Sequence, residues 1–559
     1  MLLLSNPLLS WPRYALTVYL GREDGTDGYP NHNYTDADTT PLELSAYPFL
    51  TAEYGAGAAS MYRRRVAMNL PDDIAATIPV QLGSGVNLYG YYMFHGGANP
   101  SGETEPLQES TASGGFNDLP ILNYDYQSPL GQYGEQRQTL NRIKQYHYWL
   151  NSFGSQLASM SMHQPAVIPT GSDDLSSLRW SVRSNGESGY LFVNNYVRLH
   201  PMAAQTDIQF AVNFSSSTVT LPSAPATIPS GAYFIWPLNL SLGGAKLVYA
   251  TAQVMTSLSA SGRTVYIFIP TDHVPLEFVF DPDTVSKVAS AAGTVSTDAA
   301  GRILVRPTSP DIDLALQISD KDGNNIDILV LNQTMTENLW RITVGSRDIL
   351  VLTEQALGLT SSGFELTATG LPDFSFATFP AVKCFGEGSS IATASKSDIF
   401  THYTHRKQPR TLSVTTTPLR APGIAPPIQL GGQAGGAIEP TDAVIETAQG
   451  LWTIKIPWSE IVDVDDAWLM IDYEGDLARL YADSLLLDDH FYNGETWTVG
   501  LKRFANSSKN GTLTLAVMPL RKDAPIYLQT KPAFASNGQA CAVSNITIST
   551  VYRLKIEIL

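Results

Sequence analysis

Cysteine and charged residues are both scarce in this chain of 559 residues. Its two cysteines, Cys384 and Cys541, are too few for a disulfide framework, and the sequence does not show whether they pair. Cysteine and histidine form no cluster with metal-ligand spacing, so we expect neither a metal site nor a cofactor. Charged residues make up 16% of the chain, which is little for the long surface helices that Glu, Lys and Arg favour.

Long apolar runs are also lacking. No stretch is long enough to span a bilayer, and the apolar start, Met1–Leu9, lacks the basic residues of a signal peptide. The net charge of −17 and the pI near 4.9 repel phosphate backbones and anionic lipid, so we expect no nucleic-acid and no membrane partner. A neutral substrate fits this balance better. Seven Asn-x-Ser/Thr triplets would allow glycosylation of a secreted or extracytoplasmic protein.

Glycine, proline and tyrosine are plentiful, with 43, 35 and 26 residues. Together with many Ser and Thr they favour short strands joined by polar turns. The length predicts several domains instead of a single core. The expected fold class is α/β plus all-β, with a parallel βαβ part first and β-sandwich or jelly-roll domains after it.

The stretch Tyr47–Gly57 is an apolar run that ends in one carboxylate, Glu53, followed closely by glycines. This pattern is typical of a buried parallel strand that delivers a charged side chain to the open end of a barrel. A helix predicted over Pro71–Leu82 and a strand over Asn87–Gly97 complete a βαβ unit. An amphipathic helix is then predicted over Gln138–Phe153.

Two further features flank the strand that carries the carboxylate. A strand is predicted over Tyr14–Leu20 before it, and three consecutive arginines, Arg63–Arg65, follow it. The arginines either form a solvated basic turn or hold the charge of the site in place.

Polar and aromatic side chains follow the two predicted strand ends. Tyr92, His95 and Asn99 end the second strand, and Tyr124 and Tyr126 lie in the next loop. Because the carboxyl ends of parallel strands meet at one edge of a sheet, we expect these side chains to gather near the carboxylate. Fixed donors and acceptors beside aromatic faces are what a neutral polyol needs.

Two runs carry a longer pattern with specific spacing, YMFHGGAN at Tyr92–Asn99 and YDYQSPLGQYG at Tyr124–Gly134. They closely resemble the YMFHGGTN and YDYDAPLxEYG signature of glycoside hydrolase family 35, the β-galactosidases. Gly189–Tyr196, Ile228–Asn239 and Ile471–Gly494 also look like accessory domains of this family, so the resemblance covers most of the chain.

The resemblance implies a retaining hydrolase that acts on terminal β-galactosyl residues. Glu53 would be its catalytic nucleophile, at the end of the seventh barrel strand. The implied substrate is a β-galactoside or a related oligosaccharide or polysaccharide. The tyrosines that match pocket-lining residues are Tyr92, Tyr124 and Tyr126; His95 and Asn99 belong to the signature without an assigned sugar contact. The chain departs from the family pattern at Gly55, Ala98, Gln127 and Gln132.

On this resemblance, residues 1–165 are the last strands of a partial (β/α)8 TIM barrel. A β-sandwich over 170–290 and a β-rich domain over 291–405 follow. The Pro- and Gly-rich segment 406–436 is expected to be a linker. Residues 437–559 are expected to form a jelly-roll-like sandwich. Its aromatic residues either pack in the core or form a sugar-stacking patch: Trp452, Trp458, Phe491, Tyr492 and Trp497.

The second carboxylate of the family, its acid/base, follows an Asn in an Asn-Glu pair ahead of the nucleophile. No such pair precedes Glu53. We therefore expect the C-terminal portion of a longer enzyme, whose barrel segment or partner chain supplies the acid/base. Three loop carboxylates, Glu103, Glu105 and Glu109, are the alternatives, although a solvated loop fits them better.

Two functional hypotheses follow. The chain either carries the nucleophile of a β-galactosidase-like enzyme and is inactive alone, or it is a catalytically incomplete carbohydrate-binding or structural remnant.

Overall fold

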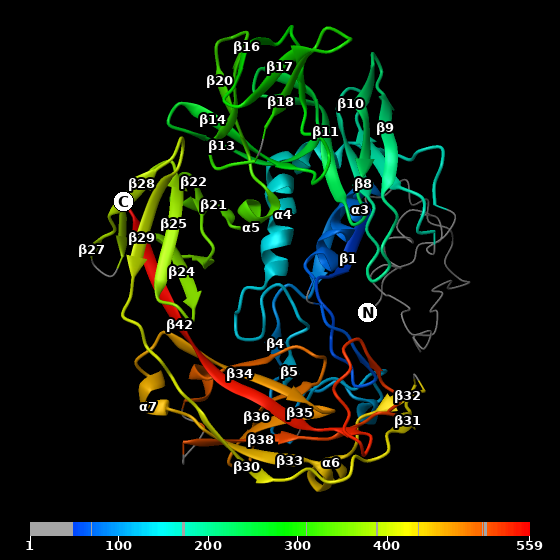
Figure 1. Ribbon diagram of the computed structural model, residues 1–559, viewed down its shortest axis with the longest axis vertical. Helices are drawn as coiled ribbons and strands as arrows, with labels where there is room; N and C mark the ends of the chain where they lie inside the picture. Colours follow the sequence, from blue (N-terminus) through cyan, green and yellow to red (C-terminus); the bar gives the residue numbers. More distant parts are fainter. Residues whose placement is uncertain are drawn as a thin grey trace.

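The computed structural model describes residues 49–68, 70–104, 106–169, 174–308, 310–386, 389–433, 435–505, 507 and 511–559. The strand predicted over Tyr14–Leu20 lies outside these residues. Within them the protein is mostly β-strands with few helices, gathered into several sheets around a central helix (Figure 1). The β-rich, multi-domain fold expected from the composition is therefore present.

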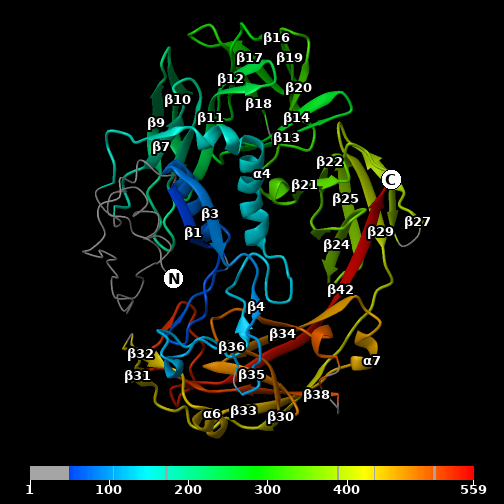
Figure 2. The same ribbon diagram turned by 180° about the vertical axis from the view of Figure 1, so that it is seen from behind.

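A parallel pair of strands opens the described chain. β1 (Phe49–Gly55) and β3 (Val86–Tyr92) lie side by side in a two-stranded sheet, as Figure 2 shows. The connection between them contains α2 (Asp72–Ala75) and α3 (Thr77–Gly83), where the sequence predicted one helix. Two aspartates in the first turn of α2 suit the positive end of the helix dipole. The βαβ unit is thus seen, with its second strand ending earlier than expected.

The central helix is α4 (Gln138–Ala158), which extends beyond the predicted end at Phe153. Its buried apolar positions recur every three or four residues, which is the spacing of one helix face, and the helix packs on β13 (Ala252–Ala260). Trp149 is completely buried, and its ring meets Tyr190 edge-on at a centroid distance of 5.1 Å. The buried residues of this face are Leu140, Ile143, Tyr146, Trp149, Phe153 and Leu157.

A buried arginine fixes the base of the βαβ unit. The Arg183 guanidinium donates hydrogen bonds to the backbone oxygens of Leu82 and Leu157, at 3.3 and 2.8 Å. Both oxygens lie in the last turns of α3 and α4, where a cation complements the negative ends of two helix dipoles. Burial lowers the pKa of Arg183 to about 10.

Two sheets and a hairpin form the first sandwich. The sheets do not end near residue 290, where the sequence placed a boundary, because the four strands between residues 293 and 330 also belong to them. The eight-stranded sheet consists of β17 (Gly293–Thr297), β18 (Ile303–Pro307), β15 (Phe278–Phe280), β12 (Ala245–Ala250), β11 (Tyr233–Leu242), β8 (Gly189–Asn194), β7 (Arg179–Ser184) and β6 (Ser161–His163). The five-stranded sheet consists of β13 (Ala252–Ala260), β14 (Arg263–Pro270), β20 (Asn325–Val330), β19 (Leu314–Asp320) and β16 (Val285–Ser290), and the hairpin of β9 (Gln205–Asn213) and β10 (Thr218–Ile228).

Three more sheets build the C-terminal half of the chain. A five-stranded sheet contains β21 (Leu339–Val344), β22 (Arg347–Leu352), β25 (Asp373–Phe379), β29 (Thr401–Arg406) and β28 (Thr393–Lys396). A seven-stranded sheet contains β23 (Ala356–Leu359), β24 (Gly363–Thr369), β42 (Ala542–Ile558), β26 (Cys384–Gly386), β27 (Ser389–Ser390), β34 (Asp466–Glu474) and β37 (Trp497–Gly500). The last five-stranded sheet contains β30 (Thr415–Arg420), β33 (Gly450–Lys455), β38 (Thr512–Val517), β35 (Leu477–Ala482) and β36 (Leu485–Phe491).

Short elements join these sheets. The two-stranded pairs are β2 (Arg64–Arg65) with β40 (Tyr527–Leu528), β4 (Gly97–Ala98) with β5 (Asn123–Tyr124), β31 (Gln429–Gly431) with β32 (Gly436–Ile438), and β39 (Leu520–Arg521) with β41 (Gln539–Ala540). The short helices are α5 (Gln333–Glu337), α6 (Asp442–Ala448) and α7 (Trp458–Ile461), with 3-10 turns η2 (Thr111–Ser113) and η3 (Lys502–Phe504).

The 17-residue strand β42 belongs to two structural units at once. Its first part pairs with β34 and its last part with β24, and in Figure 1 it runs as one continuous red arrow from the lower sheets up to the C-terminus at the left. The segment 406–436, expected to be a linker, is also partly sheet, because β30 pairs with β33. A Pro- and Gly-rich composition did not exclude an edge strand, since an edge tolerates proline.

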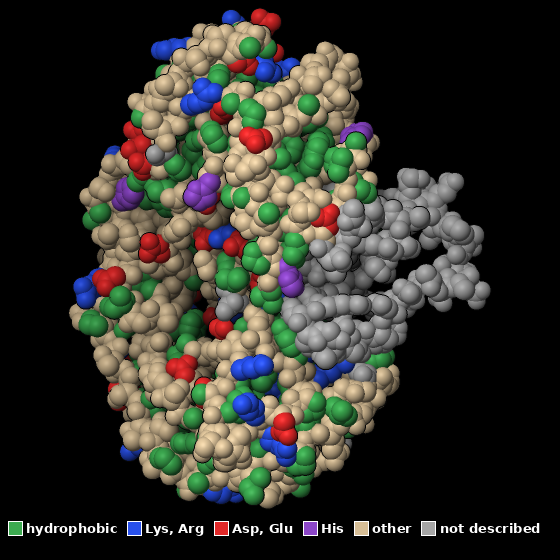
Figure 3. Space-filling model, turned by 45° about the vertical axis from the view of Figure 1, so that its right-hand side comes forward, with side chains coloured by type: hydrophobic (Ala, Val, Ile, Leu, Met, Phe, Trp, Pro, Cys, Tyr) green, Lys and Arg blue, Asp and Glu red, His purple; other side chains and the backbone are tan. Residues whose placement is uncertain are grey.

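The last five-stranded sheet packs against β34 and β37 of the seven-stranded sheet, and we call this pair of layers the C-terminal sandwich. Buried aromatic residues fill it. Tyr492 and Trp497 are each at most 5% exposed, and Trp452 and Trp458 pack partly buried against the same core. Phe491 is 1% exposed and packs edge-on against Tyr62 in a neighbouring core. The core alternative of the sequence analysis therefore describes them. Acidic and basic side chains are intermingled on the face that Figure 3 shows.

In the described part of the chain no helix has the length and apolar character needed to cross a membrane. The same residues contain no cluster of His, Cys, Asp and Glu able to hold a metal ion. Cys384 and Cys541 are not joined by a disulfide, and burial raises the pKa of both thiols to about 12.

The βαβ part and the C-terminal sandwich are joined by a buried ion pair. Arg65 and Asp476 are both completely buried, and the guanidinium donates to the Asp476 carboxylate and to its backbone oxygen. The Tyr62 hydroxyl donates to the same carboxylate at 2.6 Å. The arginine run is therefore not simply a solvated turn: Arg65 is an interior residue, and Arg63 donates to Asn117.

Replacing Asp476 by Asn should destabilise the protein by about 3–5 kcal/mol, because it leaves the Arg65 charge buried without a counter-ion. Equilibrium denaturation by urea measures the loss. Asp523→Asn is the matched control, since it removes the partner of Arg521 at an exposed pair and should leave the midpoint unchanged. Equal effects of the two variants would contradict the assigned role of the buried pair.

Candidate functional site

The predicted site residues are positioned by the adjacent ends of β1 and β3. Gly55 is opposite Tyr92 in the parallel register, so the two strands end at the same edge. Glu53 lies in β1, two positions before its last residue, while its side chain is outside the described structure. The strand and its parallel partner are present, but the expected burial is not seen where side chains are described: Leu50 of β1 and Leu88 of β3 are 54% and 53% exposed.

Three tyrosines meet at this edge. The hydroxyls of Tyr92 and Tyr124 lie 2.5 Å apart, which is hydrogen-bond distance. The Tyr126 ring lies 5.3 Å from that of Tyr92 and 4.7 Å from that of Tyr124, measured between centroids. Burial, followed by the hydrogen bond with Tyr124, raises the pKa of Tyr126 far above its ordinary value. We call Tyr92, Tyr124 and Tyr126 the tyrosine cluster; a phenolic hydroxyl can donate to and accept from other hydroxyls.

The turn that carries two of these tyrosines is built by Asp125. Its carboxylate accepts hydrogen bonds from the backbone N–H groups of Gln127 and Gln132, at 3.1 and 2.7 Å, and from the Arg137 guanidinium at 2.8 Å. Tyr126 and Gln127 have φ values of 56° and 49°, in the left-handed region. Asp125 is therefore a structural residue of the signature, and its bonds compensate the unfavourable backbone of the turn.

Two glycines let other segments approach this turn. A Cβ on Gly57 would lie 2.1 Å from the backbone oxygen of Tyr126, and one on Gly96 would lie 2.6 Å from that of Asp125. Both distances are too short for any side chain. The glycines after the two strands therefore serve close packing of the turn.

Gln127 shows why one departure from the family pattern is compatible with this fold. Its amide nitrogen donates to the backbone oxygens of Ala58 and Val66, each at 3.0 Å, and its amide oxygen accepts from the Met68 N–H at 2.8 Å. A carboxylate at this position would have no hydrogen to donate. Gln127 thus fixes the turn on the segment that follows β1.

His95 and Asn99 bond to the backbone near the cluster. His95 is exposed, and its Nδ1 contacts the backbone oxygen of Gly96. Asn99 donates from its side chain to the backbone oxygen of Ile121 at 3.0 Å and so holds two loops together. The sequence analysis grouped both residues with the tyrosines. In the structure both side chains bond to backbone oxygens of the surrounding loops.

Among the loop carboxylates, Glu109 acts electrostatically on the tyrosine cluster. Its charge is one of the causes that raise the pKa of Tyr126, and its carboxylate accepts from Asn117 at 3.3 Å. Glu103 is exposed to solvent. Glu105 lies outside the described residues.

A cavity of about 340 Å³ separates the tyrosine cluster from the C-terminal sandwich. Tyr124, Tyr126 and Arg137 line it on one side, and His490 and Trp497 line it on the other. The rings of His490 and Trp497 stack at 5.7 Å, and burial lowers the pKa of His490 to about 3. The histidine is therefore neutral at physiological pH.

The sequence analysis missed two aspartates behind this cavity, Asp488 and Asp489. Both are buried in β36, and Asp488 accepts a hydrogen bond from the Tyr133 hydroxyl at 2.8 Å. Burial and the charge of Asp489 raise the pKa of Asp488 to about 7. The signal was present: two adjacent carboxylates directly follow the apolar run Leu485–Leu487, and a buried charge needs a partner.

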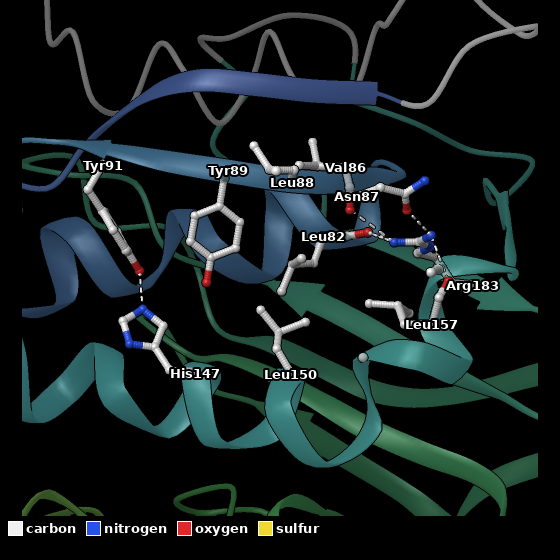
Figure 4. Close-up of a pocket in the computed structure, with 12 residues that line it drawn as sticks. Leu82, Val86, Asn87, Leu88, Tyr89, Tyr91, His147, Leu150, Leu157 and Arg183 are labelled. Carbon is white, nitrogen blue, oxygen red and sulfur yellow. Dashed lines mark hydrogen bonds between the residues drawn. The ribbon is translucent and has the colours of Figure 1, made fainter.

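A second cavity, of about 290 Å³, lies between β3 and α4 (Figure 4). Tyr91 points from the strand towards the helix, where its hydroxyl lies 2.6 Å from Nε2 of His147. Burial lowers the pKa of His147 to about 4. Leucines make up much of the remaining wall, so this cavity is chiefly apolar.

No family model and no curated protein matches this chain. Among solved structures, it shows some likeness to the crystal structure of a GH31 alpha-xylosidase from Xanthomonas citri, with 10% sequence identity and a TM-score of 0.10. The match covers 70% of this chain and 38% of that chain, so this chain spans less than half of its length. A TM-score this low carries no argument about fold or function.

Replacing Gly57 by Ala should displace the turn that carries the tyrosines and destabilise the protein by about 1–3 kcal/mol, the usual cost of overpacking. Thermal unfolding and near-ultraviolet circular dichroism of tyrosine would measure the two effects. Gly97→Ala is the control, because a Cβ there meets nothing within 4 Å. A normal tyrosine signal in Gly57→Ala would show that the turn does not depend on this contact.

Asp488→Asn should become more stable relative to the parent protein as the pH rises from 5 to 8. The folded-state pKa of Asp488, about 7, lies above the ordinary value of 3.8. Its stabilising contribution is therefore complete below about pH 3.8 and is lost as the pH rises through about 7. The difference should be on the order of a few kcal/mol.

Melting temperatures of both proteins across this pH range measure the effect. Asp483→Asn, at an exposed turn position of the same hairpin, should show no such trend. A constant difference between Asp488→Asn and the parent would exclude titration of Asp488.

Proposed function

We propose that this chain carries the nucleophile and part of the sugar pocket of a retaining glycosidase that acts on terminal β-galactosyl residues. The observation that carries the proposal is the tyrosine cluster at the shared end of β1 and β3, the edge at which the strand of Glu53 also ends. The signature resemblance supplies the sugar and the stereochemical course.

The chemistry of the edge suits a neutral sugar. Phenolic hydroxyls donate and accept hydrogen bonds, and the raised pKa keeps Tyr126 protonated when a ligand binds. Tyrosine rings also offer flat apolar faces to the C–H side of a pyranose. The net charge of −17 disfavours an anionic substrate.

In the proposed reaction the Glu53 carboxylate attacks the anomeric carbon and forms a covalent glycosyl intermediate, which water later hydrolyses. A second carboxylate, about 5 Å from the first in retaining enzymes, protonates the leaving oxygen and then activates the water. A barrel segment or partner chain that carries an Asn-Glu pair would supply it. Alone, the chain should therefore turn over alkyl galactosides slowly or not at all.

A leaving group that needs no proton isolates the step assigned to Glu53. With 2,4-dinitrophenyl 2-deoxy-2-fluoro-β-galactoside, the chain should release dinitrophenol once per molecule and keep the sugar on Glu53. Peptide mass spectrometry locates the label. Glu53→Gln should release nothing, whereas Glu103→Gln, at an exposed carboxylate, should behave like the parent. A label on another residue, or none, would refute the assignment.

The alternative is a carbohydrate-binding remnant, in which the tyrosine cluster binds a sugar without forming a covalent intermediate. It predicts that methyl β-galactoside binds in calorimetry while the activated sugar releases no dinitrophenol. Calorimetry and dinitrophenol release together therefore distinguish the enzyme from the binding remnant.

A further inference from the structure

Two adjacent residues of the C-terminal sandwich contact both ends of the segment that carries Tyr124 and Tyr126. Asp488 and Asp489 belong to β36, and both are at most 2% exposed. They lie more than 350 positions along the chain from their partners. This segment, residues 121–133, is called the tyrosine loop below.

Asp489 binds the start of the tyrosine loop. Its carboxylate oxygens accept hydrogen bonds from three consecutive backbone N–H groups, those of Ile121, Leu122 and Asn123, at 2.5, 2.8 and 3.1 Å. Tyr124 follows directly. A carboxylate suits three donors because its two oxygens together offer about four acceptor positions and no hydrogen.

Asp488 binds the other end of the loop. It accepts from the Tyr133 hydroxyl at 2.8 Å and from the Gln132 amide nitrogen at 3.3 Å. The Tyr133 ring is also in close contact with Gly500 of β37, where a Cβ would lie 2.6 Å from it. The sandwich therefore fixes this end through both a hydrogen bond and a matched surface.

The loop is rigid enough to pass these constraints to the tyrosines. Asp125 bonds to the backbone N–H of Gln132 within the loop, so the start and the end are tied to each other. The Tyr124 hydroxyl in turn bonds to that of Tyr92 on β3, and the Tyr126 ring packs against the Tyr92 ring. A shift at either end would change how these three rings are arranged.

We propose that Asp488 and Asp489 are positioning residues, through which the C-terminal sandwich sets the geometry of the tyrosine cluster. This inference rests on the proposed function, since it takes the cluster to be the sugar-binding surface. It gives the accessory sandwich a part in the site, although its residues need not touch the sugar.

Asp489→Asn tests the inference with little change in volume. An amide keeps one acceptor oxygen but points N–H hydrogens at backbone donors. We expect hydrogen–deuterium exchange of residues 121–123 to become at least ten times faster and the dissociation constant for methyl β-galactoside to rise at least tenfold. Asp483→Asn, an exposed acid in the same hairpin, should change neither. Asp489→Glu, which restores the carboxylate, should recover part of both losses.

Tyr133→Phe is the second variant, in case Asp489→Asn does not fold. It removes the bond to Asp488 and keeps the ring against Gly500. Hydroxyl-radical footprinting should then show greater modification of Tyr124 and Tyr126 than in the parent.

The outcomes separate this inference from the proposed function. Unchanged exchange at residues 121–123 in Asp489→Asn overturns the inference, as does faster exchange with unchanged galactoside affinity. If the parent binds no galactoside but exchange and footprinting change as expected, the positioning role stands and the proposed function fails.

Discussion

The arrangement of this protein depends on one buried charge pair, Arg65 with Asp476. Each partner is fully buried and comes from a different structural unit, so neither unit can leave the other without exposing a desolvated charge that has lost its counter-ion. The parallel pairing of β2 with β40 begins at the same place. The strand ends that carry the tyrosine cluster are thus held at a fixed distance from the C-terminal sandwich.

Steric and polar constraints act together on the turn that carries Tyr124 and Tyr126. Glycines at positions 57 and 96 remove side chains where backbone oxygens approach, and Asp125 satisfies the N–H groups that the tight turn leaves unpaired. Gln127 then ties the turn to the chain after β1. Each contact is weak alone, but together they hold a left-handed backbone that tyrosine would not adopt freely.

Local pattern predicted the elements near the site better than their partners. The βαβ order, the helix around Ile143 and the turn after Tyr124 follow from apolar spacing and turn residues. Arg65 and Asp489 each bind residues that lie hundreds of positions away in the chain, and no local periodicity encodes such pairings. The sheets cross the limits expected near residues 290 and 436, because β18 pairs with β15, β20 with β14 and β30 with β33.

The last strand, β42, has a consequence for how the protein is made. Hydrogen bonds from one uninterrupted strand complete both the sheet edge at β34 and the one at β24. Strands β24 and β34 both precede β42 in the chain, whereas domains usually fold as units in the order of translation. Both neighbouring units therefore keep an open edge until β42 has been synthesised, and a break after residue 551 would open the edge at β24 while the pairing with β34 remains.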